Sequence, residues 1–189
     1  MLFRFALSTL AVLSLSLTSL AETFQLDKEK SKIEFVGSKP PKNDKVESHA
    51  GGFSDFDSVL VYVPEKTEEG KFVVDIVAAS LTSDNPKLTE HLKHPDFFDV
   101  KKYPAIKFEA TSYEKDKEAE NKGKITGKLK LLDKTEEIVI PYTVEKTETG
   151  IKVVTEFKID RSKWGMTYGI PNVNADVDVK ATLAYKPKK

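Results

Sequence analysis

The stretch that decides the fold of this chain is Asp176-Val177-Asp178-Val179-Lys180-Ala181-Thr182-Leu183-Ala184-Tyr185. Apolar residues take every second position here, and charged residues stand between the first of them. A period of two is typical of a β-strand with one face in a core and the other in water. The same alternation recurs in seven further sets: Ile33 and Phe35; Val59, Val61 and Val63; Phe72, Val74, Ile76 and Ala78; Ile106, Phe108 and Ala110; Ile125, Gly127, Leu129 and Leu131; Ile138, Ile140, Tyr142 and Val144; and Ile151, Val153, Phe157 and Ile159. With segments 24–27 and 45–53, the pattern predicts roughly eight to ten strands.

The alternation indicates an all-β protein with antiparallel strands, because each strand has one apolar and one charged face. Turn-forming pairs such as Pro40-Pro41 and Thr149-Gly150 separate the strands. Such strands can form a sandwich with interdigitating inner faces, or an up-and-down barrel of about eight strands that fills itself or holds one small ligand. We expect the barrel with a cavity, because small residues stand at inward positions, namely Gly37, Ala78, Ala110, Gly127 and Ala181.

One stretch has helical spacing instead. Leu88, His91 and Leu92 fall at i, i+3 and i+4, so they share one face of a short helix. Asn85 or Asp84 can cap its start, where Pro86 is tolerated in the first turn, and Pro95 ends it. The helix is followed by two large aromatic residues, Phe97 and Phe98, in an otherwise all-strand domain. This arrangement suggests a lid or plug over an apolar interior.

The first 21 residues have the layout of a secretory signal peptide. One positive charge, Arg4, precedes an apolar run of about 13 residues, and small residues stand at Ser19 and Ala21. The alternative is a membrane anchor, but the run is shorter than the roughly 18–20 residues that span a bilayer. We therefore expect cleavage after Ala21 and a soluble, periplasmic or secreted mature protein.

Residues 22–189 then form one domain with enough length for a core. The chain has no cysteine, which excludes disulfides and thiolate chemistry, and its 30 basic and 30 acidic residues balance. Balanced charge gives no field that attracts nucleic acid, so we expect no nucleic-acid partner. Arg161 is the only arginine after Arg4.

Two motifs carry a resemblance to a known family. The segment 85–108, with its helix, Phe97-Phe98-Asp99-Val100 and Tyr103-Pro104, resembles the signature of the YceI-like family, and so does 157–166, with Asp160-Arg161-Ser162 and Trp164-Gly165-Met166. Weaker matches are 49–53, and 127–129 leading into 138–144, so the resemblance spans essentially the whole mature chain. Many members carry an Arg-Asp pair where this chain has Leu88-Thr89. That change removes an ion pair from the helix start and leaves the exact ligand open.

The resemblance implies a lipocalin-like antiparallel barrel whose apolar lumen binds an isoprenoid chain or a similar amphiphile, in a periplasmic or secreted protein without catalytic activity or cofactor. Homodimers and transient membrane contact are further expectations. The aromatic and aliphatic residues of the inner faces and of the helix region, together with the lone arginine, become the candidate ligand-binding residues: Phe35, Phe53, Ile76, Leu92, Phe97, Phe98, Phe108, Leu129, Tyr142, Phe157, Arg161 and Trp164.

Arg161 has two interpretations: it clamps a lipid headgroup at the barrel mouth, or it pairs with a carboxylate such as Asp99 or Asp160 and pins the helix to the sheet. We favour the second. His49, His91 and His94 lack the spacing of a zinc site, and no nucleophile motif or phosphate loop indicates an enzyme. Two functions remain: an exported carrier or store of an amphiphilic lipid, and a filled barrel that serves as an interaction or stress module without a small ligand.

Overall fold

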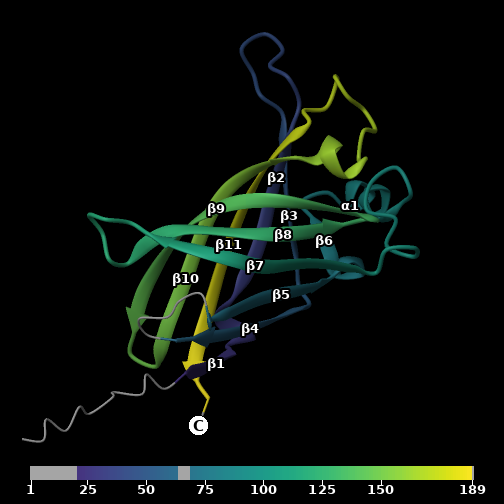
Figure 1. Ribbon diagram of the computed structural model, residues 1–189. Coiled ribbons are helices and arrows are strands. Elements are labelled where there is room, and N and C mark those ends of the chain that lie inside the picture. Colours follow the sequence, from purple (N-terminus) through teal and green to yellow (C-terminus); the bar gives the residue numbers. More distant parts are fainter. Residues whose placement is uncertain (1–20, 64–68, 189) are drawn as a thin grey trace, which may run out of the picture.

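The computed structural model describes residues 21–63 and 69–188, so the expected signal peptide lies, except for Ala21, outside the described residues. In this part of the chain, eleven strands form one sheet, accompanied by a single α-helix and three short 3₁₀ helices (Figure 1). Their bounds are β1 Glu22–Leu26, η1 Lys28–Lys30, β2 Lys32–Ser38, β3 Ser48–Phe53, β4 Phe56–Tyr62, β5 Lys71–Val77, η3 Ala78–Ser80, β6 Leu81–Ser83, α1 Pro86–Lys93, β7 Ala105–Lys115, β8 Lys122–Leu131, β9 Lys134–Thr147, β10 Gly150–Asp160, η4 Arg161–Trp164 and β11 Asp176–Pro187.

Eight of these strands close into a barrel. The order is β1-β4-β5-β7-β8-β9-β10-β11, and β11 pairs again with β1. Every pairing between strands is antiparallel, and from β7 to β11 each strand pairs with the next one along the chain. The predicted lipocalin-like up-and-down barrel is confirmed. Strands β2, β3 and β6 continue the sheet beyond β11, which brings the total above the expected eight to ten.

Strand β11 is long enough to pair with two strands on one edge. Residues Val177 to Thr182 pair with β2, and Tyr185 to Pro187 pair with β1. Ala184 lies between these ladders, where the chain leaves β1 and turns through η1. There the Ala184 carbonyl accepts from the Asp27 N–H at 2.8 Å, and the Ala184 N–H donates to Ser31 Oγ at 2.9 Å. The turn therefore leaves no gap in the hydrogen bonding of β11.

The β9–β10 ladder is short. It joins residues 143–147 to residues 150–154, and the described residues show no pairing between the two strands beyond Val154. From Thr155 to Asp160, β10 pairs with β11 alone.

Helix α1 begins as predicted. The Asn85 side chain accepts hydrogen bonds from the N–H groups of Lys87 and Leu88, at 2.9 and 3.2 Å, and Pro86 occupies the first turn. The helix ends at Lys93, because Pro95 biases His94 towards an extended backbone. It lies beside β6 at one end of the barrel (Figure 1).

The prediction of which residues of β4 point into the barrel is wrong. We predicted that Val59, Val61 and Val63 point inwards, but Val59 is 45% exposed while Ser58 is buried. Val63, just beyond the end of the strand, is buried as predicted. The Ser58 hydroxyl donates to the Val73 carbonyl and shares a hydrogen bond of 2.7 Å with Tyr185 Oη. Burial raises the pKa of Tyr185. This buried polar pair places Ser58 inside, which turns Val59 outwards.

Buried apolar side chains gather in two clusters. The first fills the barrel at the end of β1 and of the β9–β10 turn, with Phe24, Ile125, Val153 and Tyr185 among its members. The second packs under α1 and η4 and includes Leu81, Leu92, Phe97 and Trp164. No helix of the described residues is long and apolar enough to span a bilayer.

Gly127 and Gly37 provide a test of how tightly side chains pack around the strands of the sheet. A Cβ on Gly127 would lie 2.5 Å from Cζ of the Phe108 ring and 2.7 Å from the Glu109 carbonyl oxygen, whereas a Cβ on Gly37 meets nothing within 4 Å. We expect Gly127→Ala to lower the free energy of unfolding by about 1–3 kcal/mol through overpacking. Gly37→Ala should change it by less than about 0.5 kcal/mol. Urea denaturation measures both, and equal midpoints would contradict this packing.

Candidate ligand-binding site

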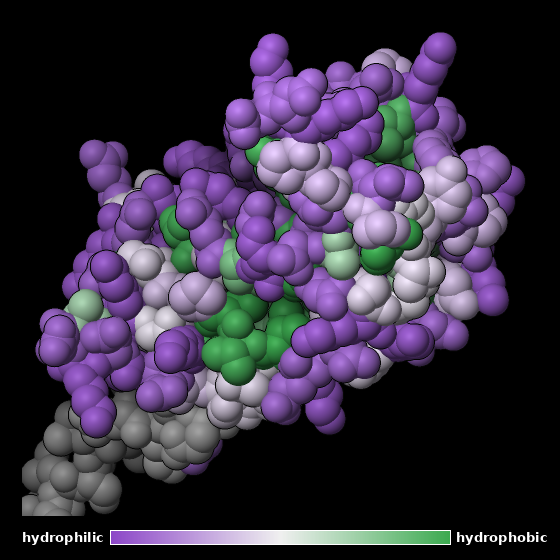
Figure 2. All heavy atoms as spheres, turned by 90° about the horizontal axis from the view of Figure 1, so that it is seen from above, coloured by the Kyte–Doolittle hydropathy of each residue, from purple (hydrophilic) through white to green (hydrophobic). Residues whose placement is uncertain are grey.

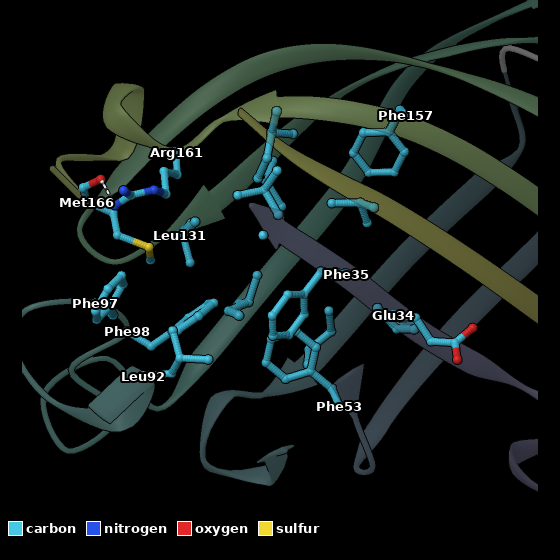
Figure 3. Close-up of a pocket in the computed structure, with 18 of the residues that line it drawn as sticks. Glu34, Phe35, Phe53, Leu92, Phe97, Phe98, Leu131, Phe157, Arg161 and Met166 are labelled. Atoms are coloured by element: carbon cyan, nitrogen blue, oxygen red, sulfur yellow. Dashed lines mark hydrogen bonds between the residues drawn. The ribbon is translucent and has the colours of Figure 1, made fainter. Parts of the chain in front are cut away.

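A cavity of about 380 Å³ lies between the two apolar clusters. This volume falls within the roughly 300–1,000 Å³ of small-molecule sites. Its wall comes from β2, β3, β5, β7 to β11 and α1, and aliphatic and aromatic side chains make up most of it (Figure 3). The barrel is therefore hollow in its middle section, between the end packed by the first cluster and the second cluster beneath α1 and η4.

The structure places most of the predicted site residues on this wall. Ten of the twelve line the cavity, namely Phe35, Phe53, Ile76, Leu92, Phe97, Phe98, Phe108, Leu129, Phe157 and Arg161. They come from six strands, helix α1, the loop that follows it, and η4. The predicted face of the helix also lies here, because Leu88, His91 and Leu92 all line the cavity.

Tyr142 and Trp164 do not line it. Trp164 is 1% exposed, lies in the cluster beneath η4, and donates from Nε1 to the Leu129 carbonyl at 3.0 Å. Tyr142 is half-buried against the first cluster, opposite Gly123 on β8. Both rings support the wall from positions outside the hollow, and alternation alone does not reveal this, since it fixes the face of a strand but not the depth along the barrel.

Three phenylalanine rings form the wall next to α1. The centroids of Phe35 on β2 and Phe53 on β3 are 5.8 Å apart, and Phe98, after the helix, lies 6.4 and 5.8 Å from them. Figure 3 shows Phe35 and Phe53 facing the same space as Phe98 and Leu92. Offset and edge-on contacts of this kind stabilise aromatic clusters. They join the helix segment to strands that are distant in sequence.

The carboxylate pairing predicted for Arg161 is wrong, while its predicted contact with a lipid headgroup stays a prediction. Its guanidinium donates to the backbone carbonyls of Asn174, Met166 and Tyr168, at 3.1, 2.7 and 2.9 Å. In the described part of the chain, it has no ion pair with a carboxylate. Asp160 instead accepts hydrogen bonds from the N–H and hydroxyl of Ser162, which lower the pKa of Asp160. Arg161 thus holds the loop between η4 and β11, and burial lowers its own pKa.

The same loop reaches α1 through aromatic contacts. His91 on the helix lies edge-on to both Phe97 and Tyr168, with centroid distances of 5.1 Å in each case, and its Nε2 is 3.1 Å from Asp96 Oδ2. The Arg161 guanidinium lies 5.6 Å from the centre of the Phe97 ring. These contacts connect the helix to the η4–β11 loop on one side of the cavity.

Charged residues stand on the other side, in the loop between β2 and β3, at the start of β3 and just after β6. His49 Nδ1 lies 3.0 Å from Asp84 Oδ1, and Lys39 donates to Glu47 at 2.7 Å. The hydrogen bond from the Ala50 N–H lowers the pKa of Asp84, and the one from Lys39 lowers the pKa of Glu47. Among the described residues, no three metal-ligating side chains gather to hold an ion.

These two loops form the mouth of the cavity. Lys39 and Glu47 from one loop and Tyr168 from the other are exposed and also line the cavity, so the hollow reaches the surface here. Asn174 joins the loops by donating from its N–H to the Ser38 carbonyl, and from Nδ2 to Ser38 Oγ, at 2.9 Å in both cases. Figure 2 looks onto the molecule from this side and shows apolar side chains enclosed by hydrophilic ones.

Several lining residues were not among the predicted ones. Phe72 and Ile140 belong to alternating sets, so the period-two signal contained them. Met166 and Tyr168 lie in a loop without periodicity, and tertiary contacts bring them to the mouth, with Arg161 for both residues and with His91 for Tyr168. Thr155 is the least expected, because it places a hydroxyl-bearing residue on the apolar wall.

A closed antiparallel barrel with an apolar, open-ended cavity defines a lipocalin-like architecture. The YceI-like domain family matches residues 24–185, and the chain belongs to this family. A UPF0312 protein of Pseudomonas putida strain W619 is 36% identical over 100 residues, which are 53% of this chain and 49% of that protein. The chain spans about half the length of the curated relatives it matches.

Solved structures share the fold. BcnA of Burkholderia cenocepacia superposes with a TM-score of 0.73 at 25% identity, covering 84% of this chain and 98% of that one. A polyisoprenoid-binding domain from Saccharophagus degradans, implicated in plant cell wall breakdown, gives 0.66 at 17% identity, with 87% and 98% covered. The second similarity concerns the fold alone.

Removing the Arg161 guanidinium tests its role in holding the η4–β11 loop. We expect Arg161→Met to lower the free energy of unfolding by about 2–4 kcal/mol, because three backbone carbonyls lose a charged donor. Lys163→Met is the matched control, since Lys163 is exposed two residues further along. Urea unfolding of both variants gives the comparison, and equal losses would show that Arg161 does not hold the loop.

Proposed function

We propose that this protein binds an amphiphilic lipid and encloses its apolar chain, isoprenoid or fatty-acyl, in the barrel cavity. The observation that carries the proposal is the cavity of about 380 Å³, lined mostly by apolar side chains and open at one end. An apolar chain gains from such a wall, while a polar headgroup remains near the charged and aromatic residues of the mouth. The polyisoprenoid-binding domain of similar fold from Saccharophagus degradans supports the same class of ligand.

The energetics favour a long chain. Each buried methylene contributes about 0.8 kcal/mol, so roughly ten carbons give useful affinity after the losses of translational and conformational freedom. The rings of Phe35, Phe53 and Phe98 already pack against one another, so they lose little further freedom when a chain lies along them.

We further propose that the protein acts as an exported carrier or store. The layout of residues 1–21 supports export to the periplasm or the medium. A carrier must collect a poorly soluble ligand from a membrane, so transient contact between the mouth and a bilayer belongs to this proposal. A homodimer is compatible with it but is not required, because one barrel provides the whole cavity.

The second candidate, a filled barrel that acts as an interaction or stress module, has less support. A filled barrel leaves no internal volume, whereas this one has a hollow between its two clusters. The absence of a catalytic role is likewise part of the proposal, and rests on the family being one of binding domains.

Native mass spectrometry of gently purified protein, with identification of material extracted into organic solvent, tests the function directly. We expect a bound amphiphile with a long apolar chain. A protein mass without any adduct, together with no thermal shift on adding prenols or fatty acids, would favour the module without a ligand.

Two adjacent residues of β2 test whether the cavity is the binding site. Gly37 lines the cavity and Val36 is 38% exposed on the opposite face of the strand. We expect Gly37→Phe to weaken binding of a dansyl-labelled fatty acid at least about tenfold, because the ring occupies volume that the chain needs. Val36→Phe is the control and should bind as the wild type does. Equal affinities for both variants would place the ligand elsewhere.

A further inference from the structure

One polar atom of the cavity wall has no hydrogen-bond partner. Thr155 lines the cavity and is 8% exposed, and its Oγ1 is buried without a partner among the described residues. Buried hydroxyls are nearly always hydrogen-bonded, because leaving one unpaired costs free energy. An unpaired hydroxyl on a wall that otherwise suits a hydrocarbon needs an explanation.

The strand pairing accounts for the missing partner. On β11, Thr155 faces Ala181, whose methyl group neither donates nor accepts. On the other side, the β9–β10 ladder ends at Val154, so β9 provides no residue opposite Thr155. Thr155 is therefore the first residue of β10 beyond the pairing with β9. It lies next to the hollow, and neither adjacent strand places a polar side chain opposite it.

Thr155 lies towards the inner end of the cavity. Phe157, two residues further along the same face of β10, projects into the hollow in Figure 3. Leu183 lines the cavity beside Ala181, while Val153 and Tyr185 belong to the packed cluster below. The charged residues of the mouth, such as Lys39 and Glu47, belong to the loop at the opposite end of the hollow.

A trapped water does not satisfy this hydroxyl well. A buried water needs two to four polar partners, and the cavity-lining side chains next to Thr155 on β10 and β11, namely Phe157, Ala181 and Leu183, are apolar. A ligand atom can serve instead. Rotation of a threonine about χ1 exchanges staggered positions of hydroxyl and methyl, so the hydroxyl can turn towards an acceptor or donor in the cavity.

We infer that Thr155 is a hydrogen-bonding subsite for the buried part of the ligand, and that this ligand carries an oxygen function, a hydroxyl, carbonyl or ether, on its inserted chain. This rests on the proposed lipid binding and narrows it. Plain hydrocarbon chains fill the cavity but leave Thr155 unpaired, whereas oxygenated chains satisfy it.

Three probes with the same headgroup and chain length test the subsite: stearic acid, a stearic acid hydroxylated in mid-chain, and one hydroxylated at the chain end. Displacement of a dansyl-labelled fatty acid from delipidated protein gives each affinity. We expect Thr155→Val to weaken at least one hydroxylated probe about five- to tenfold while leaving stearic acid unchanged or tighter. Thr155→Ser keeps the hydroxyl and should retain the preference.

Thr182→Val is the matched control, because Thr182 stands on β11 outside the cavity lining; it should behave as the wild type for all three probes. If stearic acid binds but Thr155→Val affects every probe equally, the subsite is overturned and lipid binding stands. If the wild type binds none of these probes and no prenol either, the proposed function fails and the subsite with it.

The ligand-free protein offers an independent measurement. Valine has nearly the volume of threonine but carries a methyl group in place of the unpaired buried hydroxyl. Thr155→Val should therefore raise the melting temperature of the delipidated protein by about 2–4 °C. Thr182→Val should not. A lower melting temperature for Thr155→Val would show that the hydroxyl is already satisfied in the folded protein, and would overturn the inference.

Discussion

The structure depends on the way β11 closes the barrel. One edge of β11 pairs with β10 from Asp176 to Tyr185, and the other pairs with β2 and then with β1. The change of partner occurs at Ala184, whose N–H and carbonyl are taken by Ser31 and Asp27. Without these two bonds the turn between β1 and β2 would leave an open edge at the seam. Closure here allows β2 and β3 to extend past the ring towards α1.

That extension separates two regions of the molecule. At one end the ring is complete and its interior is filled. At the other, β10 has left β9, β6 pairs among the described strands with β3 alone, and α1 with η4 provides the packing in place of a continuous sheet. Side chains from helix and loop elements cannot fill a barrel cross-section as regularly as alternating strand residues do. The hollow forms between the two regions, where the regular filling stops.

The period-two pattern predicted most of the barrel, because burial of one face per strand is a local property of the sequence. It failed on β4, where the hydroxyl pairing of Ser58 with Tyr185, 127 residues away, overrides the apolar preference of Val59. The helix cap at Asn85 was also predictable, since its bonds are local. The contacts of Arg161 were not, because its acceptors are backbone carbonyls, which carry no residue-type signal. Of the small residues taken to indicate a cavity, Gly37 and Ala181 line it, while the ring of Phe108 covers Gly127.

The size of the hollow bears on the proposed binding of a ligand. Core cavities made by mutation cost about 24 cal/mol per Å³, so a dry void of 380 Å³ would cost on the order of 9 kcal/mol. That is comparable with the whole free energy of unfolding of a typical domain. The opening at the mouth admits water and lowers this cost, but water gains little from an apolar wall. A ligand that fills the hollow removes this free-energy cost, and it stabilises the folded state more as its affinity rises. The proposed binding therefore couples ligand affinity to the stability of the fold, and ligand-free protein should be its least stable form.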